Sequence, residues 1–215
     1  MTEAEWLASA NPTPMLDQIR DHIADRKLRL FAVARSRLIW DDLTATEVRA
    51  AVEMSERHAD GQVSQHELAI ARNAAHGQAH RLWHLWRTKG APSENAVNRV
   101  FFAIFVSHDI QHLRIDPMPL LNSDALLRAS APLLLRDIFG NPFRAVAFDP
   151  AWRTDTAVAI ARQMYDSREF GAMPILADAL QDAGCEDEQV LMHCRDATAA
   201  HVRGCCVCDL VLGKV

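Results

Sequence analysis

The strongest constraint on the fold is a preference for helix along almost the whole chain. The 215 residues are rich in Ala, Leu, Arg, Glu and Gln, contain one Tyr, and hold few runs of β-branched residues. Unbranched side chains lose little freedom in a helix, whereas strands favour β-branched and aromatic residues. The sequence therefore predicts an all-α protein with no persuasive strand.

Start and stop signals divide the chain into about eight to ten helices. Thr2 with Glu5 and Ser64 with Glu67 have the spacing of capping boxes, and glycines and prolines separate the periodic segments. After two short helices at the N-terminus, the predicted helices cover residues 25–40, 46–59, 64–89, 93–110, 122–139, 155–167, 174–183 and 186–195. We expect a compact, orthogonal or bundle-like packing. The apolar segment 202–212 is short enough to be either a helix or a strand.

A single helical domain over residues 1–215 is expected from the length, which suffices for one sizeable core. Hydrophobic residues make up 49% and charged residues 24% of the chain, as in ordinary globular proteins. Pro117 and Pro119 cannot continue a helix and restrict the residues before them. This segment predicts a hinge near residues 115–122.

Charge and hydropathy restrict the partners and the compartment. A net charge of −5 offers no global positive field for a phosphate backbone, so nucleic-acid binding is disfavoured. The acidic N-terminus lacks the pattern of a secretory signal. The longest apolar stretches, residues 100–106 and 131–135, are far shorter than the roughly 20 residues that cross a bilayer. We therefore expect a cytoplasmic protein that does not enter the membrane.

A stripe of histidines supplies the first candidate metal site. His80 and His84 lie four residues apart on one predicted helix, one turn after His76, and His108 and His112 have the same spacing on the next. Side chains four apart share a helix face, so two antiparallel helices could oppose the two pairs. Such imidazoles suit zinc, another transition metal or haem. The alternative is a solvated helix with scattered histidines.

The C-terminal region supplies the second candidate site, because all five cysteines fall within residues 185–208. The reducing cytoplasm argues against a disulfide framework. The group comprises Cys185, His193, Cys194, His201, Cys205, Cys206 and Cys208. A zinc site formed by His193 or Cys194 with His201, Cys205 and Cys208 is chemically reasonable, and the last two have Cys-x-x-Cys spacing. Packing of buried cysteines in the core is the favoured interpretation, and a redox-active thiol is the third.

Several blocks of the sequence resemble a family of uncharacterised proteins abundant in planctomycete bacteria. The blocks are MTEAEWL (1–7) with PML (14–16), DRKLRLF (25–31), LRDIFGNPFR (135–144), PILADAL (174–180), HVRGC (201–205) and LVLGK (210–214). The resemblance implies no known activity. Members commonly carry bulky apolar residues at Cys206 and Cys208, and the histidines in the middle of the chain fall outside the blocks.

Catalytic motifs are missing from the sequence. It has no G-x-S-x-G elbow, phosphate-binding glycine loop, H-E-x-x-H or dinucleotide fingerprint. These absences favour a non-enzymatic helical module that binds an unknown protein partner or a second copy of itself. The alternative is a metal-binding or haem-binding protein that uses the histidine pairs or the C-terminal Cys/His group.

Overall fold

The protein is all-α in the part of the chain that the structure describes. The computed structural model describes residues 1–108, 125–196 and 198–214, and these form eleven α-helices, four short 3-10 turns and no strand. The predicted fold class is confirmed. Within the same residues, no helix combines the length and the apolar character that crossing a bilayer requires.

The helices form two compact units. Unit 1 consists of Met1–Ile19 and Pro132–Val215, and unit 2 consists of Arg20–Ala131. The single-domain prediction takes no account of this division. The hinge predicted near residues 115–122 lies outside the described residues.

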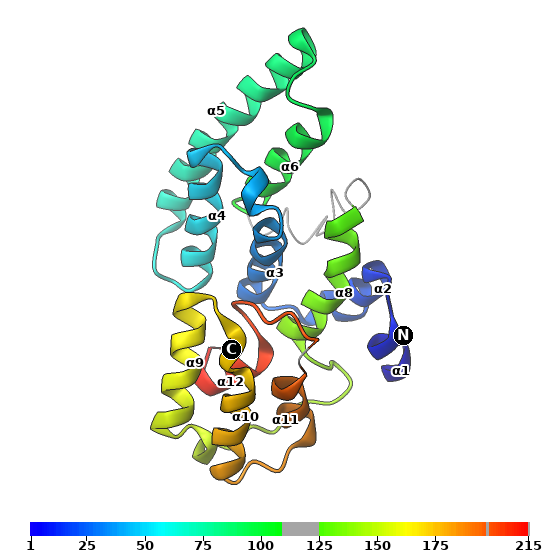
Figure 1. Ribbon diagram of the computed structural model, residues 1–215, viewed down its shortest axis with the longest axis vertical. Helices are drawn as coiled ribbons and strands as arrows, with labels where there is room; N and C mark the ends of the chain where they lie inside the picture. The colour runs from blue at the N-terminus through cyan, green and yellow to red at the C-terminus, as the bar shows by residue number, and fades with distance from the viewer. Residues whose placement is uncertain (109–124, 197, 215) are drawn as a thin grey trace. The chain divides into compact units, whose positions relative to one another are not determined.

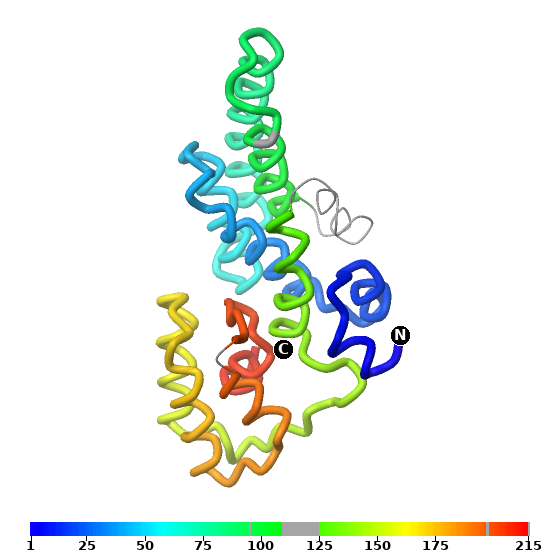
Figure 2. Tube along the Cα trace, turned by 45° about the vertical axis from the view of Figure 1, so that its right-hand side comes forward, coloured from blue at the N-terminus to red at the C-terminus, as the bar shows by residue number. Residues whose placement is uncertain are grey.

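Unit 2 is a packed set of four helices of 12 to 25 residues. They are α3 (Asp25–Arg37), α4 (Thr46–Ala59), α5 (Gln65–Lys89) and α6 (Glu94–Phe105). Helix α4 packs against α3, α5 and α6, and α6 runs back along α5 (Figures 1 and 2). The apolar faces of these helices form the core around Phe31, Val52, Leu68 and Phe102, which are buried.

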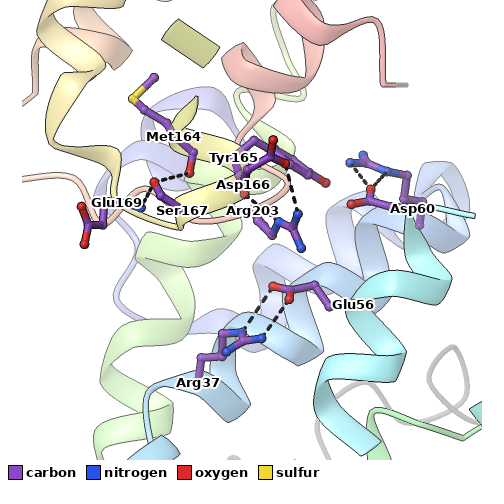
Figure 3. A network of polar contacts seen from close by, with 10 residues as sticks. Arg37, Glu56, Asp60, Met164, Tyr165, Asp166, Ser167, Glu169 and Arg203 are labelled. Atoms are coloured by element: carbon purple, nitrogen blue, oxygen red, sulfur yellow. Dashed lines mark hydrogen bonds and ion pairs between the residues drawn. The ribbon is translucent and has the colours of Figure 1, made fainter. Parts of the chain in front are cut away.

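Two ion pairs in unit 2 join α3 to the C-terminal part of α4 and to the residue that follows it. Arg37 on α3 donates to Glu56 on α4 at 2.8 Å, and the Glu56 side chain is only 1% exposed (Figure 3). Arg26 pairs with Asp60 at 3.1 Å. These contacts fix α3 against α4 by charge as well as by apolar packing.

Unit 1 brings the N-terminal helices together with the C-terminal half of the chain. Its helices are α1 (Glu3–Ala8), α2 (Pro12–Ile19), α9 (Asp155–Ser167), α10 (Met173–Asp182), α11 (Glu188–Arg195) and α12 (Cys206–Leu212). Helix α8 (Ala125–Phe139) continues through Pro132 and reaches into this unit. Arg136 on α8 donates to the Trp6 carbonyl at 2.9 Å and to the Ser9 carbonyl. The guanidinium thereby tethers the N-terminal segment to the end of α8.

The core of unit 1 is small and rich in sulfur. Helices α9, α10, α11 and α12 pack around alanines, leucines and valines together with Met164, Met173 and four of the cysteines. Small side chains let these short helices approach closely. All five cysteines lie within the described residues, and they are thiols rather than disulfides.

Most predicted helix limits agree with the structure. Helices α4 and α9 have the predicted bounds, and both predicted capping boxes are present. Two predictions are too long, because α3 ends at Arg37 and α6 at Phe105. The ambiguous C-terminal segment contains helix α12, and Gly204 in the left-handed region precedes it.

Candidate metal centre

Four side chains with metal-binding atoms converge inside unit 1. They are Asp137, His193, His201 and Cys205, and one potential ligand atom from each lies within 4.8 Å of all the others. Among the residues that the structure describes, this is the one group of three or more such side chains that it brings together.

Four of the separations between the donor atoms range from 2.7 to 3.9 Å and so lie around the values of a tetrahedral metal site. Zinc bonds of about 2.0–2.3 Å correspond to donor-to-donor distances of about 3.3–3.8 Å in a tetrahedron. Nε2 of His193 lies 3.3 Å from Asp137 Oδ1 and 3.2 Å from Cys205 Sγ. Nδ1 of His201 lies 2.7 Å from Asp137 Oδ1 and 3.9 Å from Cys205 Sγ. These distances scatter around the tetrahedral value, with the carboxylate and His201 closest.

The carboxylate of Asp137 is oriented by the backbone. Asp137 lies near the C-terminal end of α8, and its Oδ2 accepts a hydrogen bond from the Val202 amide at 2.9 Å. That contact leaves Oδ1 facing the two imidazoles. Gly140, with φ of +67°, ends the helix three residues later, and a Cβ there would come within 3.3 Å of Cys206 Sγ.

The other three donors come from α11, the following loop and the start of α12. His193 lies in the last turn of α11, and His201 lies in the loop. The Cys205 amide donates to the Val202 carbonyl at 2.9 Å, which closes a turn through Gly204 at φ of +94°. A glycine suits this backbone conformation, which L side chains rarely adopt. The turn places Cys205 at the N-cap position of α12.

The four side chains of the site are largely buried. Asp137 is 2% exposed and Cys205 is fully buried, and the side chains of His193 and His201 are 17% and 6% exposed. Nδ1 of His201 faces the group, whereas its Nε2 is buried without a hydrogen-bond partner among the described residues. The contacts of Nδ1 therefore determine how this ring lies.

The anionic neighbours of His193 and His201 raise the pKa values of both histidines. Burial by itself lowers the pKa of His193, but Cys205 and Asp137 outweigh this effect and raise it to about 10. Burial likewise opposes the charged form of His201, and its hydrogen bonds to Asp137 and Cys205 raise the pKa to about 9. The anionic neighbours therefore favour the protonated form of both rings.

The pKa of the Cys205 thiol is lowered, whereas the pKa of the Asp137 carboxyl is raised. Burial disfavours the Cys205 thiolate, but hydrogen bonds from Cys206 and Cys208 and the charge on His193 lower the pKa of Cys205 well below its ordinary value. Burial raises the pKa of Asp137, and the two histidines offset this only in part. Pairs of groups shifted in this way are typical of functional sites.

The remaining cysteines behave as buried neutral thiols. Burial is the main reason that the pKa values of Cys185 and Cys194 are raised. Hydrogen bonding to Cys205 and burial raise the pKa of Cys208, whose thiol lies 3.6 Å from the Met173 sulfur. A metal ligand must be ionised, so these three thiols are poorer donors than Cys205.

Only some of the residues predicted for the C-terminal candidate site lie together in the structure. The structure brings together His193, His201 and Cys205, while Cys194 and Cys208 are not members of the group. Sequence reasoning missed Asp137, although it belongs to the LRDIFGNPFR block. A carboxylate 56 residues before the nearest other donor has no spacing signal, and only folding brings it to the site.

The histidine stripe pairs differently from the sequence prediction. Nε2 of His108 lies 3.0 Å from Nε2 of His76, which is one turn before the predicted partners. His80 and His84 have ring centroids 5.6 Å apart, and both contact Trp83 on the same helix. His112 lies outside the described residues.

The fold and the site together define an all-α protein with a buried Asp/His/His/Cys group. Comparison of the chain with protein-family models, with curated proteins and with solved structures finds no match. The resemblance to the planctomycete family stays a prediction.

Proposed function

We propose that this chain is a metal-binding helical protein in which Asp137, His193, His201 and Cys205 hold one transition-metal ion, with zinc as the first candidate. The observation that carries the proposal is the convergence of the four donor atoms within 4.8 Å of one another. Carboxylate, imidazole and thiolate are the groups that bind zinc in proteins.

Charge balance supports a divalent ion. One carboxylate and one thiolate contribute two negative charges, and two imidazoles bind as neutral ligands. A divalent cation therefore makes the buried group neutral. Burying a carboxylate and a thiolate without opposite charge is costly in free energy, and the cost grows as the site becomes less exposed to solvent.

The number of protein donors supports a structural role. Structural zinc sites have four protein ligands, whereas catalytic sites keep a position for water or substrate. The protein supplies all four donors of this group, which is the number of ligands in a structural site. The ion would cross-link α8 to α11 and α12. This role agrees with the absence of catalytic motifs, and a cytoplasmic location would keep Cys205 reduced.

The decisive experiment is metal analysis of full-length protein prepared without a histidine tag and supplied with zinc. We expect close to one zinc per chain. Cobalt substituted for zinc should give the intense visible bands of a tetrahedral site and a thiolate-to-cobalt charge-transfer band. That band should disappear in Cys205→Ser.

Matched variants separate the two candidate sites. Asp137→Asn should lose the zinc, whereas Asp178→Asn, at an exposed position of the same unit, should keep it. The double variant His80→Ala/His84→Ala should also keep it. Loss of zinc from the double variant but not from Asp137→Asn would move the site to the histidine stripe. Failure of the unmodified chain to bind zinc or cobalt would overturn the proposal.

The sequence also predicts a protein partner or self-association. No contact in the described residues identifies such a partner, so this stays a prediction. The metal proposal does not depend on it.

A further inference from the structure

A second thiol lies directly beside the thiolate of the proposed metal centre. Cys208 is in the first turn of α12, three residues after Cys205, and residues three apart lie on the same side of a helix. Both sulfurs are buried, and the Cys208 thiol donates a hydrogen bond to the Met173 sulfur at 3.6 Å. Cys208 itself is not among the four converging donors. A buried thiol that is not one of the four converging donors therefore lies within one helical turn of the donor cysteine.

We propose that a peroxide oxidises this pair to a Cys205–Cys208 disulfide and thereby releases the metal. The inference rests on the proposed metal site and adds a form of regulation to it. Cys-x-x-Cys spacing is the one at which disulfide oxidoreductases form their disulfide. A disulfide sulfur carries no negative charge, so the ion would lose one of its two anionic ligands.

The chemistry balances with hydrogen peroxide as the oxidant. The Cys205 sulfur attacks one peroxide oxygen, an S–O bond forms, and the O–O bond breaks. The peroxide gains two electrons, and its second oxygen leaves as water after protonation. The Cys208 thiol then attacks the sulfenic sulfur, loses its proton, and expels the hydroxyl group as a second water. Two thiols have lost two electrons and two protons, and one peroxide has become two waters.

The geometry favours Cys208 over the other thiols. Cys206 is adjacent to Cys205, and consecutive helical side chains point in different directions. The Cys206 sulfur lies 3.8 Å from His193 Nε2, on a half-buried edge of the site. Cys194 belongs to another helix, α11. His193 and Cys206 are the partly exposed residues beside the buried Cys205.

The test treats the zinc-loaded full-length protein with hydrogen peroxide and follows zinc release and disulfide formation together. Trypsin cleavage after Arg203 and Lys214 leaves Cys205, Cys206 and Cys208 in one peptide, 204–214, whereas Cys185 and Cys194 share peptide 169–195. We expect zinc release to coincide with the loss of two hydrogen atoms from peptide 204–214. Reduction and added zinc should restore the metal site.

Single substitutions test which thiol resolves the sulfenic acid. Cys208→Ser should bind zinc but release it at least about tenfold more slowly under peroxide, because no disulfide can form at that position. Cys206→Ser should behave like the unmodified chain. Equal release rates from Cys208→Ser and the unmodified chain would overturn the inference, as would a disulfide that links the two peptides.

The two proposals fail in different ways. If the reduced protein never binds zinc, the proposed function fails. If zinc binds but stays bound after peptide 204–214 has been oxidised, only the inferred regulation fails.

Discussion

Units 1 and 2 are both helical, but the interactions that stabilise each unit internally differ. The four main helices of unit 2 have 12 to 25 residues, and buried ion pairs such as Arg37–Glu56 join them. In unit 1, α1, α2, α11 and α12 have only six to eight residues. Helices shorter than about 12 residues have little stability of their own. The unit with the shorter helices also contains all five cysteines and the proposed metal centre, and an ion bound there would join several of these short segments.

Removal of the proposed metal should have the largest effect, because it should destabilise unit 1 and leave unit 2 unchanged. A metal that binds only the folded state at about a thousandfold above its Kd contributes about 4 kcal/mol. A tight chelator should therefore destabilise unit 1 by at least that amount. Hydrogen exchange measured by mass spectrometry should show protection lost in α9, α10, α11 and α12 and kept in α4 and α5. Equal loss in both units would mean that they unfold together.

The buried ion pair should give the opposite pattern. Glu56→Gln leaves Arg37 without its anionic partner, and Arg37 remains partly exposed, so we expect a loss of about 2–3 kcal/mol from unit 2. Zinc content should not change. The exposed pair of Arg195 with Asp178 in unit 1 is the control, because Asp178→Asn should cost no more than about 0.5 kcal/mol. Denaturant unfolding of each variant measures both values, and a similar cost at the two positions would contradict the assigned role.

The number of protons released on zinc binding should test whether His193 and His201 are ligands. The pKa values of His193 and His201, about 10 and about 9, exceed the ordinary value of 6.5. Their pairing with the anions therefore stabilises the metal-free protein fully below about pH 6.5, and this contribution is lost as the pH rises through 9 to 10.

Zinc binds neutral imidazole, so binding at pH 7 should release about two protons, and the affinity should rise about a hundredfold per pH unit. Calorimetric titrations in two buffers of different ionisation enthalpy measure the number of protons. Release of less than one proton would show that the histidines are not ligands.

The smallest expected effect comes from two glycines with the same backbone angle. Gly140 in unit 1 and Gly90 in unit 2 both have φ of +67°. A Cβ at Gly140 would contact Cys206, whereas nothing lies within 4 Å of one at Gly90. Each alanine substitution should cost about 1–2 kcal/mol from backbone strain. Only Gly140→Ala should also weaken zinc binding in a chelator competition, and equal zinc affinities would show that the Cys206 contact is unimportant.

The sequence predicted the helices well because their signals are local. Ser64 and Glu67 satisfy each other within one turn, so the start of α5 could be read directly from the sequence. The end of α6 was predicted five residues too late, because the apolar pattern continues beyond Phe105. Local periodicity cannot show where tertiary packing ends a helix.

The candidate site was only partly visible in the sequence. His193, His201 and Cys205 fall within 13 residues of one another, and short spacing is what a sequence motif records. The same reasoning also included Cys194 and Cys208, which have suitable spacing. It could not distinguish them from the members of the converging group, because the direction of a side chain and its pKa depend on what surrounds it.

Local patterns in the amino-acid sequence are enough to predict that the chain is helical, where most helices begin and end, and which short segment carries the thiol and imidazole groups. These properties depend on residues that are neighbours along the chain. Only the tertiary structure added Asp137 from α8, paired His76 with His108, and separated the chain into two units. Contacts between distant residues depend on how helices pack, and no pattern of local spacing contains that information.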